Sequence, residues 1–77
     1  MISYSPLWET MKKKNATTYT LRTKGQVYSI GSGTIKRLQN NQSVSTNTLD
    51  AICNILDCII PDIIVFIPDK RNQKDSL

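Results

Sequence analysis

The chain has 77 residues, enough for one small domain with a limited hydrophobic core but with little room for a substrate cleft beside it. Its hydrophobic share of 39% is typical of a folded domain, and the lack of histidine removes the commonest general base and metal ligand. The net charge of +4 is unevenly divided: residues 1–48 carry seven basic residues and one acidic residue, whereas residues 49–77 carry three basic and five acidic residues. The basic part favours a polyanionic partner, although a solvated basic surface would have the same composition.

The two cysteines, Cys53 and Cys58, cannot complete a four-ligand zinc site within one chain that has no histidine. We expect no cofactor, and we expect both thiols to be reduced, buried and structural in a cytoplasmic protein. The first seven residues do not have the pattern of a signal peptide, and the longest apolar stretches are far too short to cross a membrane. We therefore expect no membrane association, and no small-molecule substrate is evident.

The first helix is expected to begin with Ser5 as its N-cap and Pro6 at the first helical position, where a missing N–H costs nothing. Its buried stripe would consist of residues three and four apart, namely Leu7, Trp8 and Met11. Three lysines then suit the negative end of the helix dipole, and Asn15 follows as a stop signal.

A short second helix is expected to have Thr17 as its cap and Leu21 as its core residue, and to run to about Thr23. Gly25 follows as a stop signal. Residues 26–32 then predict a loop with some strand character.

The stretch SIGSGTIKR, residues 29–37, begins a third helix at Gly31 or Ser32 that runs to about Gln39 and has its core residues at positions 35 and 38. Its glycines are two apart, which does not match a Walker loop, and no third glycine completes a dinucleotide-binding fingerprint. The stretch does fit a helix that enters the major groove of DNA, because small residues admit a phosphate and Lys36 and Arg37 are long donors. A plain helix start with a solvated Lys–Arg pair would have the same sequence.

The fourth helix has the clearest periodicity. Ser45 is its expected cap, and it would end at residues 58–59. Its apolar stripe repeats at i, i+3, i+4 and i+7, in Leu49, Ile52, Cys53 and Leu56. Residues 61–64 predict a further helical turn and residues 65–67 a short strand, and the polar residues 69–77 predict a disordered tail.

Three stretches of the chain resemble Cro/Xre-type helix-turn-helix regulators, in particular the short stand-alone kind common in Firmicutes and their mobile elements. ISYSPLWETMKKKN is similar to that group's opening helix, GTIKRLQNNQSVSTNTLDAICNILDC to its recognition helix, turn and fourth helix, and DIIVFIPD to its closing segment. The resemblance covers most of residues 2–69 and is most specific over residues 33–58. It implies an all-α, five-helix, lambda-repressor-like DNA-binding domain over residues 1–68, with a short C-terminal strand, in which the second and third helices form the reading unit.

The resemblance also implies which residues contact DNA. The candidates are Thr17, Thr18, Ser32, Gly33, Thr34, Lys36, Arg37, Asn40 and Asn41. The first two lie at the start of the second helix and the last two in the turn after the third, where they would contact phosphates. The other five would lie at the start and on the DNA-facing side of the third helix. The link between the second and third helices is longer than usual in this group, which makes Gln26 and Tyr28 further candidates.

We therefore expect a sequence-specific regulator of transcription that binds double-stranded DNA in the major groove with the helix at about residues 32–39. No acid–base or nucleophile–base pair is evident, so the chain is not expected to be an enzyme. The alternative is a protein-interaction module, such as an antitoxin or anti-repressor, that uses the same fold without DNA. The apolar run IIVFI, residues 63–67, offers material for a homodimer, unless it packs on the chain's own core by pairing with residues 1–4.

Overall fold

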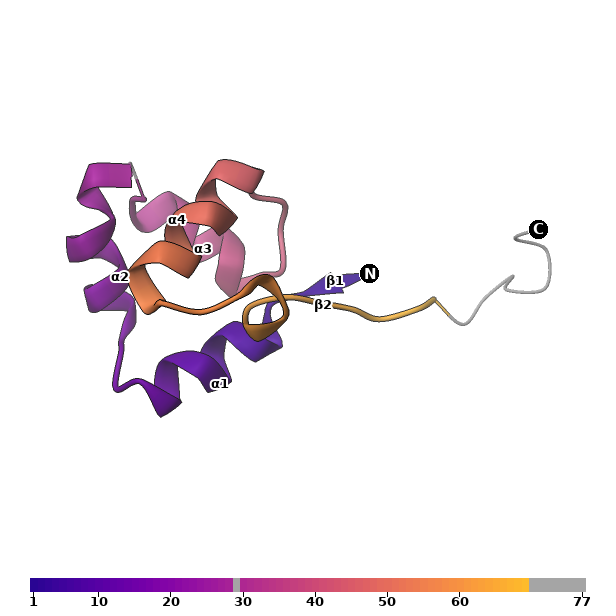
Figure 1. Cartoon of the computed structure of the whole chain (residues 1–77). Helices are drawn as coiled ribbons and strands as arrows, with labels where there is room; N and C mark the ends of the chain where they lie inside the picture. Colours follow the sequence, from indigo (N-terminus) through magenta and orange to yellow (C-terminus); the bar gives the residue numbers. More distant parts are fainter. Residues whose placement is uncertain (29, 70–77) are drawn as a thin grey trace.

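The computed structural model describes residues 1–28 and 30–69, and this part of the chain is mainly helical (Figure 1). Its four α-helices are α1 (Ser5–Lys13), α2 (Thr18–Lys24), α3 (Ser32–Gln39) and α4 (Thr46–Leu56). Turns of 3₁₀ helix follow α2 and α4, namely η1 (Gly25–Tyr28) and η2 (Ile60–Asp62), and the two short strands are β1 (Ile2–Ser3) and β2 (Val65–Phe66). The expectation of five helices is wrong, because the segment expected as the fifth forms only the turn η2 before strand pairing begins at Val65.

Two helices begin with the side-chain caps that the sequence predicts. The hydroxyl of Thr17 accepts a hydrogen bond from the backbone N–H of Thr20, and the hydroxyl of Thr20 accepts one from the N–H of Thr17, both at 3.2 Å. At the start of α4 the hydroxyl of Ser45 accepts a hydrogen bond from the N–H of Thr48 at 3.2 Å, without the reciprocal bond. The expected cap of α1 is wrong by one position, because Ser5 is already helical and Tyr4 precedes it without a capping side-chain bond.

Three helices end in the same Schellman turn. Each is followed by a residue with left-handed backbone: Asn15 (φ 56°) after α1, Asn41 (φ 55°) after α3 and Asp57 (φ 53°) after α4. In each turn the next N–H reaches back five residues to a carbonyl, from Ala16 to Met11 and from Gln42 to Arg37 at 2.8 Å, and from Cys58 to Cys53 at 3.1 Å. Asn and Asp tolerate this conformation better than other non-glycine residues. The turn ends α4 at Leu56, earlier than the predicted end at residues 58–59.

The core lies where the helices meet. The five largest fully buried side chains comprise one from each α-helix and one from the segment after η2: Leu7, Leu21, Leu38, Ile52 and Ile63. Other residues of the predicted stripes are also buried, including Met11, Ile35 and Leu56. Trp8, Leu49 and Cys53 are partly buried and pack against this core. Burying a side chain of this size stabilises a fold by roughly 1.5–3 kcal/mol, so these stripes are what hold α2 and α3 in place.

The long link between α2 and α3 is not an open loop. The turn η1 continues directly from α2 and packs against α4. Ile30 then closes the link, because its side chain is buried and its N–H donates to the carbonyl of Gly25 at 2.9 Å. A Cβ atom on Gly25 would lie 2.7 Å from the Cβ of Ile30, so this close approach requires glycine. The link therefore sets the position of α3 relative to α2 despite its length.

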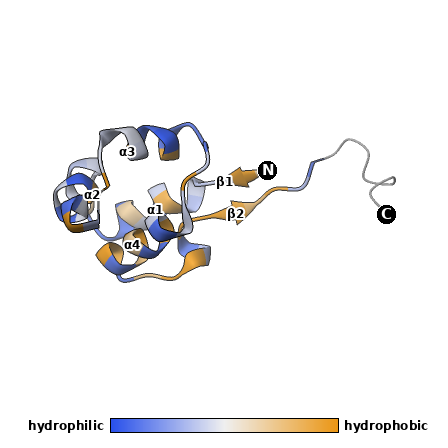
Figure 2. Ribbon diagram, turned by 90° about the horizontal axis from the view of Figure 1, so that it is seen from above, coloured by the Kyte–Doolittle hydropathy of each residue, from blue (hydrophilic) through white to orange (hydrophobic). Residues whose placement is uncertain are grey.

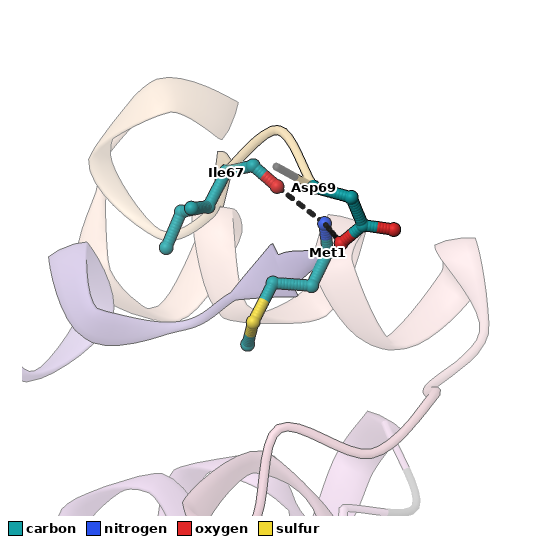
Figure 3. Close-up of polar contacts among 3 residues, drawn as sticks. All are labelled: Met1, Ile67 and Asp69. Atoms are coloured by element: carbon teal, nitrogen blue, oxygen red, sulfur yellow. Dashed lines mark hydrogen bonds and ion pairs between the residues drawn. The ribbon is translucent and has the colours of Figure 1, made fainter. Parts of the chain in front are cut away.

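The strands β1 and β2 form an antiparallel ribbon. Its register aligns Ile2 with Phe66 and Ser3 with Val65. At its open end the N–H of Ile67 donates to the carbonyl of Met1 at 2.7 Å, while the amino group of Met1 donates to the carbonyl of Ile67 and lies 3.9 Å from a carboxylate oxygen of Asp69 (Figure 3). The predicted strand is confirmed over Val65–Phe66, and its pairing with residues 1–4 is the alternative that was set against a dimer role for this run. The paired strand does not pack on the core, however, because Val65, Phe66 and Ile67 remain exposed. The ribbon is hydrophobic and lies at the opposite end of the molecule from α2 (Figures 1 and 2).

The predicted polar tail, residues 69–77, lies outside the described residues from residue 70 onward. Within the described ranges, no helix has the length and apolar character needed to span a bilayer.

Candidate nucleic-acid interface

A shallow groove of about 330 Å³ runs between α2 and α3. The side chains that line it are Thr18, Tyr19 and Arg22 from α2 and Ser32, Ile35, Lys36 and Gln39 from α3. The four α3 residues are spaced i, i+3, i+4 and i+7, which places them along one side of the helix. All of the lining residues except Ile35 are exposed, so the groove is an open polar surface between two helices.

The outward side of α3 carries further candidates. Because an α-helix turns about 100° per residue, the buried residues Ile35 and Leu38 define its inward direction. The opposite direction is taken by Gly33, Lys36, Arg37 and Asn40, all of them exposed. Lys36 therefore belongs both to the groove and to the outward side. Arg37 and the half-buried Thr34 lie on the flank farther from α2.

The basic side chains of α2 and α3 are not neutralised by neighbouring acids. Within residues 1–28 and 30–69 the ion pair is that between Met1 and Asp69, and it involves no residue of α2 or α3. Among the described residues, the acidic side chains outside α2 and α3 are Glu9 on α1 and Asp50, Asp57, Asp62 and Asp69 on α4 or beyond it, and none lies on α2 or α3. Unpaired ammonium and guanidinium groups on one surface create a positive potential that attracts polyanions.

The start of α3 is unusually open. Its N-cap is Gly31, and no side chain caps its first turn, unlike the first turns of α2 and α4. A Cβ atom at Gly31 or Gly33 would meet nothing within 4 Å, and neither residue has a positive φ. The fold itself does not require glycine at these two positions. The free N–H groups of this first turn can therefore be approached closely by an anion from outside.

Some predicted phosphate contacts also have structural roles. Thr17 caps α2, while Thr18 is exposed and lines the groove. Asn40 is exposed after α3, and Asn41 adopts the left-handed backbone of the Schellman turn. The side-chain oxygen of Asn41 accepts a hydrogen bond from the N–H of Tyr4 at 2.9 Å, and the hydroxyl of Tyr4 donates to the carbonyl of Gln42 at 2.9 Å. Asn41 therefore ties the end of α3 to the start of α1 and lies outside the groove.

Three exposed groove residues were not among the candidates chosen from the sequence: Tyr19, Arg22 and Gln39. Their spacing carried a signal, because Arg22 is four residues after Thr18 and Gln39 is three after Lys36, which puts each pair on one side of its helix. The guanidinium of Arg22 lies 6.0 Å from the centre of the Tyr19 ring, at the outer limit of a cation–π contact. Of the residues chosen from the sequence, Gln26 and Tyr28 lie on η1, outside the groove lining, and both are exposed.

The chain is similar to a family of DNA-binding domains and to a solved structure. Residues 6–69 match the family profile described as the Cro/C1-type HTH DNA-binding domain. A solved structure described as "Crystal structure of transcriptional regulator VanUg, Form II" is similar with a TM-score of 0.75 and 29% sequence identity, over 88% of this chain and 87% of that one. No curated protein sequence matches the chain.

Proposed function

The chain belongs to the Cro/C1-type helix-turn-helix DNA-binding family, and from this premise we propose that it is a sequence-specific regulator of transcription that reads the major groove with α3. The similarity to a transcriptional regulator over most of both chains supports the regulatory role. We place the DNA-binding domain at residues 1–68, which includes all the helices described above.

One observation carries the proposal: unpaired donors gather on the groove between α2 and α3 and on the outward side of α3. Lys36 and Arg37 can donate to the acceptors of guanine, and the hydroxyls of Ser32 and Thr34 can donate to or accept from base edges. The open start of α3 supports a close approach of a phosphate to its backbone, because a side chain at Gly33 would fill that space.

The proposed phosphate contacts flank the reading helix on both sides. Thr17 and Thr18 lie at the start of α2, and Asn40 and Asn41 follow α3. Asn41 can serve because its side-chain oxygen is bonded to Tyr4, whereas its side-chain nitrogen Nδ2 has no hydrogen-bond partner among the described residues. Such contacts fix the register of the protein on the duplex without reading its sequence.

Selection from random duplex DNA, followed by binding measurements at several salt concentrations, tests the proposal. We expect one enriched sequence and an affinity that falls steeply with salt, with a log–log slope of about −0.9 for each phosphate contact. The double variant Lys36→Ala, Arg37→Ala is the control, since both residues are exposed and their loss leaves the core intact. If no sequence is enriched and salt has no effect, the DNA-reading proposal fails and the protein-interaction alternative takes its place.

We further propose that the protein binds DNA as a homodimer. One helix-turn-helix unit buries little surface on DNA, and units of this kind usually bind in pairs on half-sites one helical turn apart. The ribbon face, defined by the exposed residues Met1, Ile2, Val65, Phe66 and Ile67, offers apolar surface for a second copy. It lies at the opposite end of the molecule from α2 (Figure 2), so a copy bound there leaves α2 uncovered. Sedimentation that gives a monomer both free and on DNA would remove this proposal.

A further inference from the structure

The Schellman turn at the end of α4 brings the two cysteines together, away from the proposed DNA surface. The N–H of Cys58 donates to the carbonyl of Cys53 at 3.1 Å, and these are the two positions whose side chains meet in such a turn. The same hydrogen bond limits the separation of the two Cα atoms. The path from one Cα atom to the other consists of the Cα-to-oxygen distance in Cys53, the hydrogen bond, and the N–Cα bond of Cys58. The two Cα atoms therefore lie within roughly 7 Å of each other, which is the limit for a disulfide.

Both thiols are free and can be reached from solvent. Each side chain is partly exposed. Both line one shallow cleft of about 430 Å³ beside α4, together with Leu49, Ile59 and Ile60. A small reagent that enters this cleft therefore meets two thiols at once.

We propose that Cys53 and Cys58 form a vicinal dithiol that a small disulfide oxidises to an intramolecular disulfide. The thiolate of one cysteine attacks a sulfur of the small disulfide, so that a mixed disulfide forms and one small thiolate leaves. The other cysteine then attacks the mixed disulfide, the Cys53–Cys58 bond forms and the second small thiolate leaves. The two cysteines are oxidised, the small disulfide is reduced to two thiols, and these take up the two protons.

The surroundings of Cys58 favour the closed form once it exists. Burial in the apolar cleft, together with the neighbouring Cys53, raises the pKa of the Cys58 thiol to about 11. A thiol of high pKa is a poor leaving group, so an incoming thiolate reopens the bond slowly by displacing Cys58. The same pKa makes Cys58 a scarce nucleophile at neutral pH, and we therefore expect closure to be slow and to accelerate with rising pH.

The bond would connect the last turn of α4 to the segment that leads into η2. None of the residues that line the α2–α3 groove belongs to that segment. We therefore expect formation of the disulfide to stabilise the fold and to leave the affinity for DNA unchanged. The test of this inference is thus independent of the test of the proposed function.

Intact-mass measurement after incubation of the native chain with oxidised glutathione tests the inference. We expect a product that is lighter by two hydrogens, whereas Cys53→Ser and Cys58→Ser should each stop at a single glutathione adduct. Accumulation of adducts on the parent chain, cross-linking between copies, or no reaction at all would overturn the proposal.

A second measurement uses the parent chain alone and does not depend on whether the serine variants fold. The chain is equilibrated with mixtures of reduced and oxidised glutathione, once in buffer and once in denaturant, and the fraction that carries the Cys53–Cys58 disulfide is measured. This fraction gives the effective concentration of one cysteine thiol relative to the other. We expect it to be about tenfold or more higher in buffer, because the folded turn already holds the thiols together. A lower value in the folded chain would show that the native turn opposes the bond, which contradicts the inference.

Discussion

Arg37 and Lys36 are adjacent in sequence but face different surroundings. The side of α3 that faces the bases therefore determines which of the two contributes more to the affinity for a specific site. Lys36 lines the groove against α2, whereas Arg37 points outward on the far flank. We predict that Arg37→Ala weakens binding to the selected site by roughly 1–3 kcal/mol and relaxes specificity at one position. Titration of labelled specific and scrambled duplexes measures both effects.

Lys12→Ala is the control for this prediction. Lys12 is exposed in the last turn of α1, so its loss should weaken binding mildly and to the same extent on both duplexes. If Arg37→Ala binds as tightly as the parent while Lys36→Ala does not, the groove flank reads the bases and our placement of Arg37 is wrong.

Asp57 is held in an unfavourable state by the turn that ends α4. Its backbone is left-handed, and its carboxylate lies at the negative end of the helix dipole. We predict that Asp57→Gly raises the free energy of unfolding by about 0.5–1 kcal/mol, because glycine adopts this backbone without strain. The contact from Lys14 is kept, since it reaches the carbonyl of Asp57 and not its carboxylate. Urea denaturation measures the change.

The matched control is Asp50→Gly, in the interior of α4. Asp50 is helical and exposed, and its carboxylate accepts a hydrogen bond from the side-chain nitrogen of Asn54 at 3.4 Å. Glycine there removes that bond and has a lower helix propensity, so the free energy of unfolding should fall by roughly 0.3–1 kcal/mol. Each substitution removes one carboxylate and therefore the same amount of charge. A rise in stability at both positions would show that the lost charge, not the backbone geometry, dominates.

At the scale of elements, the sequence predicts what depends on neighbouring residues. Thr17 and Ser45 cap their helices as expected, because a hydroxyl and an N–H three residues on are enough to form the cap. The apolar stripes are likewise local patterns. The turn η1 is different: its geometry depends on the contact between Gly25 and Ile30 and on packing against α4, which no local pattern encodes.

In the candidate site too, the sequence predicts what depends on neighbouring residues and not what depends on the packing of one helix against another. The residues of α3 could be chosen from its own sequence, because the helix start and the inward residues define its outward side. Tyr19 and Arg22 join the site only through the way α2 lies against α3. That arrangement is set by the link through η1. The spacing of Arg22 after Thr18 therefore indicates a shared side of α2, but it does not show that this side faces α3.

Gly33 in α3 provides a test in which the stability of the fold and the affinity for DNA are expected to change in opposite directions. Gly33 is helical with open space around it, so Gly33→Ala should raise the free energy of unfolding by about 0.5–1 kcal/mol. If a phosphate approaches the start of α3 closely, the added methyl group should at the same time weaken DNA binding. Unfolding curves and DNA titration of the same sample separate the two effects.

Gly25→Ala is the contrasting variant. Its Cβ atom would lie 2.7 Å from the Cβ of Ile30, so we expect it to destabilise the fold by about 1–3 kcal/mol. Should Gly33→Ala bind DNA as tightly as the parent, the proposed close approach of a phosphate to α3 is excluded.

The whole molecule has two differently composed ends. The polar groove with its unpaired basic side chains lies between α2 and α3, and the apolar ribbon lies at the other end (Figures 1 and 2). The pairing of β1 with β2 uses one edge of each strand and leaves Phe66 with 64% of its surface exposed. Exposed apolar surface gathered in one place marks an interaction site more often than isolated apolar residues do.

We predict that Phe66→Ser weakens self-association and DNA binding together while it changes the stability of the monomer little. A side chain that is mostly exposed contributes little to the monomer core, but its burial against a second copy would remove apolar surface from water. Val27→Ser is the control, because Val27 is 86% exposed on η1, outside the ribbon face. Sedimentation at several concentrations, free and with DNA that carries one or two half-sites, follows the effect. Equal loss in both variants would point to a general effect of lost hydrophobic surface, whereas no loss with Phe66→Ser would mean that the ribbon face does not join two copies.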